Sequence, residues 1–311
     1  MIILKNFDDI YEYFKENHNI IFPTETVYGL GSRANDNIGI ENIYKIKNRP
    51  KNNPLIIHFY SIEEIQKYTI VKQIELELLR YFTPGPLTIL LKKKHKDIFK
   101  LATNNSSKIC CRIPNDFLTL ELIKNFGPIA GPSCNFSQKL TITKEHMLRE
   151  EYKNIHIGVF LNDENVKGIE STIIEVSEND LEINILREGI VTKTNIVNFL
   201  NKNNFNNYIV NISSEKKIIP GNYFPHYQIN KPLSIFDYKE ENSFHISYGN
   251  EICDFNLSTI ENIEEIIKNY YYSLFLGDLS DFKKVTIKPF PFSEEFSSLH
   301  SKLKKSLNKN S

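Results

Sequence analysis

The chain has 311 residues with 38 basic and 38 acidic side chains, so its formal net charge at pH 7 is zero. Hydrophobic residues make up 41% of the sequence, which allows a sizeable core and excludes a wholly disordered chain. The neutral balance argues against a protein that holds nucleic acid by bulk charge alone, although it is compatible with a local basic pocket.

The first two thirds of the chain alternate helical and strand patterns. Apolar side chains recur at helical spacing in some segments, and short apolar runs bounded by Pro or Gly mark strands between them. Helices are expected at 7–17, 38–47, 62–81, 116–125 and 143–152, and strands at 19–22, 54–60, 87–93, 108–113, 128–130, 155–161, 171–176 and 183–186. This interleaving predicts an α/β fold with a twisted mixed sheet layered with helices.

The composition changes at residues 201–232, which are rich in Asn with scattered Lys, Pro and Gly. We interpret this segment as a linker with some ordered contacts. Residues 233–311 then show two strands, a helix near 258–275, another strand at 283–290 and a closing helix. Since the length suggests two domains, we expect a larger unit at 1–200, the linker, and a small α/β domain.

The cysteines Cys110, Cys111, Cys134 and Cys253 show no paired metal-binding spacing. They are expected to be reduced, small, buried side chains. No run approaches about 18 uncharged apolar residues, and the first residues lack the features of a signal peptide. We therefore expect a cytoplasmic protein with no membrane partner.

A polar turn follows the first predicted strand, in the segment FPTETVYGLG. Thr24 and Thr26 lie at the end of a buried strand, where ligand crevices of open α/β sheets tend to form. Their hydroxyls are able to bind a polar ligand. Hydrogen bonds within an ordinary turn explain them as well, and from the residues alone that explanation is the more frequent one.

Three basic residues cluster at the end of the helix at 38–47. Spacing places Lys47 on the apolar face of that helix, so its side chain either snorkels or points into a cleft. Arg49 precedes a proline, which favours an extended backbone. Lys47, Arg49 and Lys51 suit phosphate groups, or they simply complement the helix dipole. His58, on the next strand, is either a ligand contact or a buried core histidine.

Further polar residues occur at predicted strand ends. Arg112 shares a strand face with small side chains, and its planar guanidinium suits a carboxylate. Gly131 and Ser133 belong to a run of small residues that would let a phosphate approach backbone N–H groups. Thr141 is able to cap the helix that follows. Two more strand-end residues are Ser171 and Arg187.

The sequence contains no P-loop, Rossmann fingerprint, HExxH, GxSxG, zinc-type Cys/His spacing or kinase signature. Nothing in it calls for a side-chain nucleophile. A site built from hydroxyls, Lys, Arg and backbone donors predicts catalysis by positioning and charge stabilisation, as in nucleotidyl or phosphoryl transfer.

Seven segments, in this order and spacing, resemble the threonylcarbamoyl-AMP synthases with a YrdC-like domain: FPTETVYGLG, IKNRPKNNPLIIH, TPGPLTILLKK, CCRIP, IAGPSCN, GIESTII and ILREG. The resemblance covers residues 3–195. The segment IPGNYFPHY resembles the linker of longer family members, which carry a small Rossmann-like C-terminal domain. This chain departs from the family at Asn48, where Gly is usual, and at Glu188, within the RPG-type ending.

The resemblance implies an enzyme that condenses L-threonine, bicarbonate and ATP into threonylcarbamoyl-AMP and pyrophosphate. A separate transferase complex would then modify an adenosine of tRNA, so that complex is an implied partner and tRNA contact a further one. Mg²⁺ would accompany the nucleotide, with no metal ligand expected from the protein.

Site residues carry over by motif. Lys47 and Arg49 are implied to be catalytic and to bind ATP, and Arg112 to bind the threonine carboxylate. The remaining residues implied for ATP are Asn53, Ser133, Asn135, Thr141, Arg187 and Asn222. The remaining residues implied for threonine are Thr24, Thr26, His58, Gly131 and Ser171.

Two other functions stay open at this point. One is a YrdC-like module that grips RNA without synthesis, although the neutral charge and the compact basic cluster count against it. The other is a carbamoyl-phosphate-using transferase, in which the same domain is one module of a larger chain. Neither the acylphosphatase-like nor the zinc-finger segment of such a chain is present.

Overall fold

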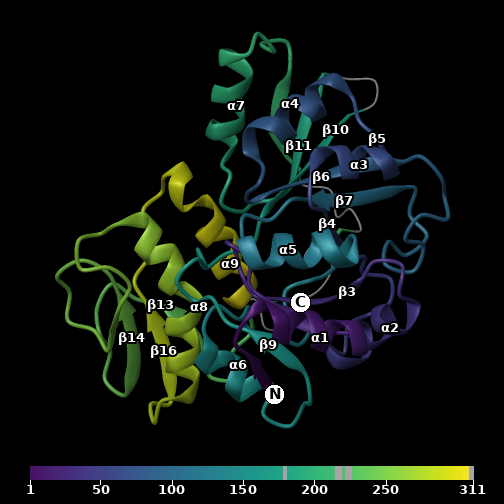
Figure 1. The fold of residues 1–311 in the computed structure, drawn as a ribbon. Coiled ribbons are helices and arrows are strands. Elements are labelled where there is room, and N and C mark those ends of the chain that lie inside the picture. The colour runs from purple at the N-terminus through teal and green to yellow at the C-terminus, as the bar shows by residue number, and fades with distance from the viewer. Residues whose placement is uncertain (178–180, 214–218, 221–225, 308–311) are drawn as a thin grey trace.

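The computed structural model describes residues 1–177, 181–213, 219–220 and 226–307. It contains two α/β units, a large one and a smaller one formed by the C-terminal part of the chain (Figure 1). The strands of the large unit are β1 (Ile2–Leu4), β2 (Ile20–Phe22), β3 (Gly29–Arg33), β4 (Ile56–His58), β5 (Thr69–Ile70), β6 (Leu87–Lys93), β7 (Lys108–Arg112), β8 (Ile129–Ala130), β9 (Gly158–Phe160), β10 (Thr172–Val176), β11 (Glu182–Arg187) and β12 (Ile209–Ile212).

The helices of the large unit are α1 (Phe7–Glu16), α2 (Asn37–Ile46), α3 (Ile62–Tyr68), α4 (Gln73–Phe82), α5 (Phe117–Phe126), α6 (Glu145–Glu151) and α7 (Lys193–Lys202). Within the described residues the strands form one 12-stranded sheet in the order β1-β9-β2-β3-β8-β4-β7-β6-β10-β11-β12, with β5 paired to β6. The sheet is mixed, since β2 pairs with β9 in parallel and with β3 in antiparallel. The predicted fold class is confirmed.

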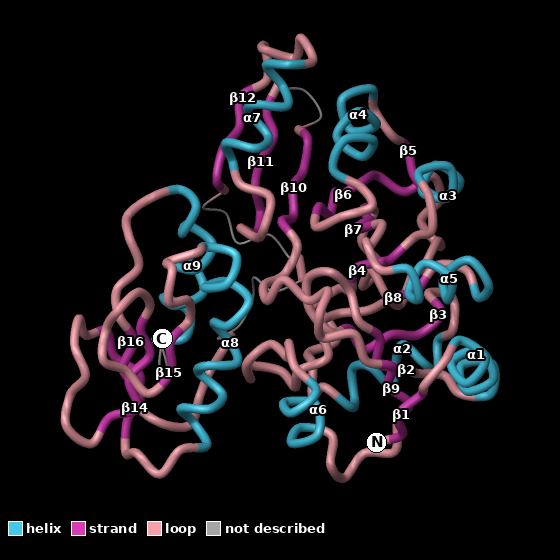
Figure 2. Tube along the Cα trace, turned by 60° about the vertical axis from the view of Figure 1, so that its left-hand side comes forward, coloured by secondary structure: helices cyan, strands magenta, loops and turns pink. Residues whose placement is uncertain are grey.

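The smaller unit contains β13 (Leu233–Ile235), β14 (Ser243–Ser247), β15 (Phe255–Asn256), α8 (Ile263–Leu279), β16 (Lys284–Ile287), the 3₁₀ helix η1 (Glu294–Phe296) and α9 (Ser297–Leu307). Its strands pair in the order β13-β16-β14-β15, all in parallel. Helices α8 and α9 lie between this sheet and the large unit (Figure 2). The small domain therefore presents helices, and not its sheet, to the rest of the protein.

The segment 62–81, expected as one helix, forms two helices, and this prediction was wrong in detail. Ser61 caps α3, but the helix ends before Thr69. Thr69 begins a run of three β-branched residues, whose restricted side chains favour extended backbone. That run forms β5, and Glu75 then caps the start of α4 through the Lys72 backbone N–H.

Several elements carry weak sequence signals. Strand β3 includes Gly29 and Gly31, which have low strand propensity. A Cβ at Gly31 would lie 2.5 Å from the Phe22 ring, so glycine is needed for β2 and β3 to pack. Strand β12 lies inside the range 201–232 and pairs in parallel with β11. Part of that range is thus integrated into the large sheet.

None of the helices in the described part of the chain is long and apolar enough to cross a bilayer. All four cysteines are free; Cys110, Cys111 and Cys134 are buried and Cys253 is half-buried. Burial raises the pKa of the Cys110 thiol to about 12. The buried thiols therefore act as small apolar side chains, as predicted.

Candidate functional site

A polar cavity of about 410 Å³ lies where several strands of the large sheet end. Its volume is within the usual range of small-molecule sites, about 300–1,000 Å³. Every residue implied for the site by the family motifs lines this cavity, except Asn222, which lies outside the described residues. Lys51, the third residue of the predicted basic cluster, is exposed and does not line it. The lining residues that were predicted are Thr24, Thr26, Lys47, Arg49, Asn53, His58, Arg112, Gly131, Ser133, Asn135, Thr141, Ser171 and Arg187.

Lys47 lies at the C-terminal end of α2 and is only 2% exposed. Its ammonium group donates to the backbone oxygen of Ser133 at 2.6 Å and to that of Asn135. Burial, followed by the nearby Arg49 charge, lowers the pKa of Lys47 to about 7. The apolar-face placement thus directs Lys47 into the cavity wall, as the cleft alternative predicted.

Arg49 braces the loop that follows α2. Its Nε donates to the backbone oxygen of Asn53 at 3.1 Å, and its Nη2 donates to Asn53 Oδ1 at 2.6 Å and to the Pro54 oxygen at 2.8 Å. The preceding Asn48 has φ +49°, a left-handed conformation that Asn adopts more readily than other non-Gly residues. Asn48 therefore adopts a backbone conformation in which Gly would also be unstrained.

Arg112, which also lines the cavity, belongs to a buried ion pair. Arg112 Nη2 lies 2.8 Å from Glu25 Oε1, and both side chains are about one-twentieth exposed or less. Glu25 also accepts a hydrogen bond from the Asn115 backbone N–H at 2.9 Å. Among the described residues, Nε of Arg112 has no hydrogen-bond acceptor, whereas Nη2 is engaged by Glu25. Arg112 therefore keeps one directed donor for a ligand although its charge is paired.

His58 is buried beside Arg112 and packs edge-to-face against Phe22, with ring centroids 5.5 Å apart. Burial, and then the Arg112 charge, lower the pKa of His58 to about 3, so the ring is neutral at pH 7. Its Nδ1 lacks a hydrogen-bond partner in the part of the chain that the structure describes. The ligand-contact interpretation therefore suits this histidine better than that of a satisfied core residue.

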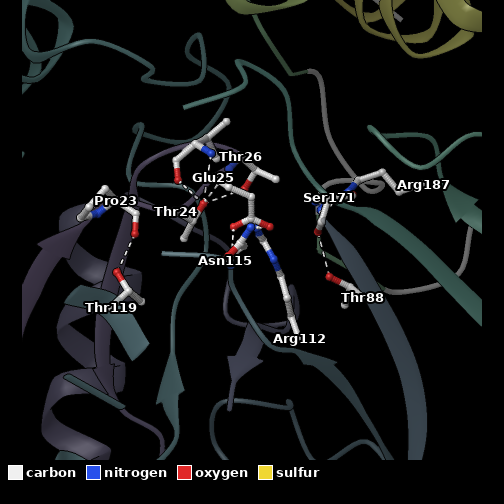
Figure 3. Close-up of polar contacts among 11 residues, drawn as sticks. Pro23, Thr24, Glu25, Thr26, Thr88, Arg112, Asn115, Thr119, Ser171 and Arg187 are labelled. Carbon is white, nitrogen blue, oxygen red and sulfur yellow. Dashed lines mark hydrogen bonds and ion pairs between the residues drawn. The ribbon is translucent and has the colours of Figure 1, made fainter. Parts of the chain in front are cut away.

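The two threonines of the first motif are joined to each other. The Thr24 hydroxyl donates to the Val27 oxygen at 2.7 Å and accepts from the backbone N–H groups of Thr26 and Val27. The hydroxyls of Thr24 and Thr26 are 2.7 Å apart. Because Thr24 already donates to Val27, Thr26 donates to Thr24. The turn explanation is thus correct for Thr24, whose contacts are drawn in Figure 3, and Thr26 also lines the cavity.

Ser171 and Arg187 form a second group in Figure 3. Arg187 Nη2 donates to the Ser171 hydroxyl at 3.0 Å, and Nε and Nη2 also donate to the Ser171 backbone oxygen. The Thr88 hydroxyl lies 2.8 Å from that of Ser171. Glu188, the departure from the family motif, lines a separate cavity of about 240 Å³, so its side chain does not enter the main one.

The wall after β8 completes the cavity. Asn135 donates to the backbone oxygens of Phe136 and Lys139, each at 3.0 Å, while its buried Oδ1 has no partner among the described residues. A Cβ on Gly131 would lie 2.8 Å from the Phe22 ring, which explains the need for glycine there. Thr141 is 1% exposed and donates to Glu170 at 2.6 Å.

Sequence reasoning missed some cavity residues. Glu170 lies inside the GIEST segment, but a single carboxylate within an otherwise apolar and hydroxyl motif gave no signal of its own. His226 and Tyr227 belong to the segment recognised as linker-like, and they line the cavity together with Pro220. Burial lowers the pKa of His226 to about 3, so it contributes a neutral ring.

The donor set of the cavity does not suit a metal ion held by the protein. Glu25 faces Arg112, and Glu170 faces Thr141 and Lys302. Within the described residues no cluster of three or more His, Cys, Asp or Glu is arranged to hold a metal. Mg²⁺, which prefers carboxylate, phosphate and water oxygens, would have to enter bound to the phosphates of a nucleotide.

Comparison with known proteins identifies the family. Residues 12–189 match the model of the Sua5/YciO/YrdC family, described as telomere recombination. Threonylcarbamoyl-AMP synthase of Bacillus subtilis (strain 168) is 32% identical over 234 residues, which are 75% of this chain and 67% of that protein. The synthase of Pyrococcus abyssi is 36% identical over 170 residues, or 53% of this chain and 49% of that protein.

A crystal structure of P. abyssi Sua5 complexed with L-threonine superposes with a TM-score of 0.85 at 24% identity, over 99% of this chain and 97% of that one. The fold and the cavity thus define a class of mixed α/β proteins with a cation-lined ligand site at the strand ends and a small added domain. The chain belongs to the Sua5/YciO/YrdC family. The family resemblance seen in the motifs is confirmed.

Proposed function

We propose that the protein is a threonylcarbamoyl-AMP synthase, a nucleotidyltransferase that condenses L-threonine, bicarbonate and ATP and releases pyrophosphate. The observation that carries the proposal is the presence, in one cavity, of two separate cationic positions, Lys47 with Arg49 and Arg112. A nucleotide and an amino acid bring separate anionic groups, and each position suits one of them. The name of the B. subtilis and P. abyssi relatives supports the same activity.

The threonine end is proposed around Arg112. Its Nε donor, which has no acceptor among the described residues, would bind the substrate carboxylate. Thr26, whose hydroxyl proton is engaged by Thr24, would accept a hydrogen bond from the substrate amine or hydroxyl. The neutral His58 ring, Gly131 and Ser171 would complete the pocket for the amino acid.

The ATP end is proposed around Lys47 and Arg49. Their side chains are held by backbone oxygens, and among the described residues no carboxylate lies within ion-pair distance of either. That arrangement leaves positive charge available for phosphates. The other residues proposed for the nucleotide are Asn53, Ser133, Asn135, Thr141 and Arg187, with Asn222 outside the described residues.

The chemical step follows from these positions. The threonine nitrogen bonds to the carbon of bicarbonate, water leaves, and an N-carboxylate forms. One oxygen of that carboxylate bonds to the α-phosphorus of ATP while the bond to pyrophosphate breaks. Lys47 and Arg49 stabilise the charge that develops on the phosphate oxygens, a contribution that is typically the largest in such reactions. No side chain is covalently modified.

The test supplies L-threonine, bicarbonate and MgATP and follows threonylcarbamoyl-AMP by mass spectrometry. ATP–pyrophosphate exchange is measured in parallel, and it should require both threonine and bicarbonate. Exchange with ATP alone would contradict the mechanism, because the N-carboxylate is the proposed nucleophile. Product formation without bicarbonate would contradict it as well.

Cytoplasmic location, a downstream transferase complex and tRNA contact are parts of the same proposal. The downstream transferase is supported by the chemistry, because threonylcarbamoyl-AMP is a mixed anhydride that needs an acceptor. An RNA-binding module without synthesis is not favoured by the relatives from B. subtilis, P. abyssi and Schizosaccharomyces pombe, which carry the synthase name. Salt-dependent RNA binding without nucleotide turnover would restore that alternative.

A further inference from the structure

Glu170 connects the cavity with the small C-terminal domain. The carboxylate is 6% exposed and lines the cavity just before β10. The Tyr271 hydroxyl, on α8, donates to Oε2 at 3.2 Å and to Oε1 at 3.5 Å. Lys302 Nζ, on α9, lies 3.8 Å from Oε2 and donates to the Glu188 backbone oxygen at 2.8 Å. Two helices of the small domain thus hold a carboxylate of the large one.

Thr141 and Tyr227 are further partners of this carboxylate. The Thr141 hydroxyl donates to Glu170 Oε1 at 2.6 Å, and Thr141 also lines the cavity. Burial alone would raise the pKa of Glu170, but Lys302, Arg187 and the Thr141 hydrogen bond outweigh burial and hold the pKa below its ordinary value. At neutral pH Glu170 is therefore ionised and can only accept hydrogen bonds.

This geometry fixes the direction of the Thr141 hydroxyl. A threonine hydroxyl has one proton, and Thr141 uses it in the hydrogen bond to the ionised Glu170 carboxylate. Toward the cavity Thr141 then presents only lone pairs. A phosphate oxygen is also an acceptor, so it would meet Thr141 without a proton between them, which is unfavourable.

We propose that Glu170, held by Tyr271 and Lys302, positions the Thr141 hydroxyl as a hydrogen-bond acceptor that selects a donor group of the nucleotide, a ribose hydroxyl or a ring amine. Thr141 is then a contact of the nucleoside part and not of the phosphates. Glu170, Tyr271 and Lys302 are positioning residues, and the small domain contributes to nucleoside recognition. The inference rests on the proposed use of the cavity for ATP.

The presence of a buried, charged lysine at position 302 agrees with this positioning role. Lys302 is 2% exposed, and burying an ion pair usually costs about as much as its attraction returns. An apolar side chain would therefore join the two domains equally well. A charged partner, in contrast, favours the ionised form of Glu170 and so keeps the Thr141 proton in place.

The experiment measures binding by calorimetry with ATP, 2′-dATP, 3′-dATP, purine riboside triphosphate and inorganic tripolyphosphate. Thr141→Val removes the hydroxyl at nearly constant volume. It should lower the affinity for ATP about tenfold and leave the affinity for tripolyphosphate unchanged. One of the three analogues, the one that lacks the recognised group, should bind the wild-type protein about as weakly as ATP binds Thr141→Val. The substitution should not weaken the binding of that analogue any further. Thr141→Ser should restore most of the affinity.

Two results would overturn the inference. Equal losses for ATP and tripolyphosphate on Thr141→Val would make Thr141 a phosphate donor. An ATP affinity unchanged by Thr141→Val would remove the role of Thr141 in nucleoside recognition. The same conclusion would follow if Thr141→Val weakened the binding of each of the three analogues further than the missing group alone does.

The small domain is tested with Lys302→Met and, in case that protein does not fold, with Tyr271→Phe. Either substitution should lower the affinity for ATP severalfold and leave the affinity for tripolyphosphate unchanged. Lys304→Met is the matched control, because Lys304 is exposed on the same helix and the charge change is identical. ATP affinities equal to that of the control in both variants would contradict the positioning role.

These measurements separate the two proposals. They follow ATP binding and not product. A protein that binds ATP in this pattern but forms no threonylcarbamoyl-AMP would contradict only the proposed function. A protein that forms the product without the pattern would contradict only the role of Thr141 and Glu170.

Discussion

Lys47 and Arg49 are held by backbone carbonyl oxygens, whereas Arg112, in the same cavity, faces the carboxylate of Glu25. Carbonyl dipoles orient a cation without cancelling its charge, so the region of Lys47 and Arg49 remains positive. The region of Arg112 is close to neutral but keeps a directed donor at Nε. The difference suggests that the first region attracts a highly charged ligand, while the second selects a ligand by geometry.

The largest expected effect comes from removing the carboxylate that pairs with Arg112. Glu25→Ala leaves the buried Arg112 without its carboxylate partner, and such changes typically cost about 3–5 kcal/mol of unfolding free energy. Chemical denaturation measures this loss. L-Threonine should stabilise the variant more than the wild-type protein, because its carboxylate would replace the missing one. Equal stabilisation of both proteins would place the substrate carboxylate elsewhere.

The next largest effect concerns Lys47 and Arg49, which are held by backbone oxygens. Lys47→Ala or Arg49→Ala should reduce the rate of ATP–pyrophosphate exchange by about 10²–10³-fold, since each removes a charge that stabilises the transferring phosphate. Unfolding free energies of the variants serve as the control for folding. Full exchange activity in either folded variant would remove that residue from the catalytic assignment.

A smaller effect is a pH dependence carried by Lys47. Its pKa in the free protein is lowered to about 7, so the side chain loses its proton above that pH. Phosphates favour the charged form, so ATP must recruit a proton as it binds. ATP affinity should fall as pH rises above about 7, by up to about tenfold per unit. Lys47→Arg, which keeps its proton, should flatten the dependence in titrations between pH 6 and 9.

The smallest effect tests the loop that carries Arg49. Asn48 has positive φ, where Gly is unstrained and most side chains cost about 1 kcal/mol or more. Asn48→Gly should leave stability and exchange activity near the wild-type values. Asn48→Val should cost about 1–2 kcal/mol in thermal or chemical unfolding. A Val variant as stable as the Gly variant would show that this backbone shape is not required.

Much of the fold was predictable because the strong signals are local. The apolar stripe of α1, the Ser61 cap and the turn before β6 each depend on a few adjacent residues. Strand β3 was missed because its glycines serve the packing of Phe22, a residue on another strand. The two-residue strand β5 was missed because it exists only through pairing with β6.

The site was predictable to the extent that family motifs carry its residues. Those motifs name side chains but not their partners. The Glu25–Arg112 pair and the network around Glu170 join segments far apart in the sequence, and no spacing rule reveals them. Directions of hydrogen bonds, as for Thr26 and Thr141, likewise become visible only when both partners are placed.

The arrangement of Glu170 and Lys302 also has a consequence for biosynthesis. The ribosome makes Glu170 well before Lys302, so the carboxylate waits in a forming pocket until α9 has been translated and docked. Domains generally fold in the order of their synthesis. A nascent chain would therefore acquire its phosphate-facing cations early and its nucleoside selectivity late, as the final maturation step of the cavity.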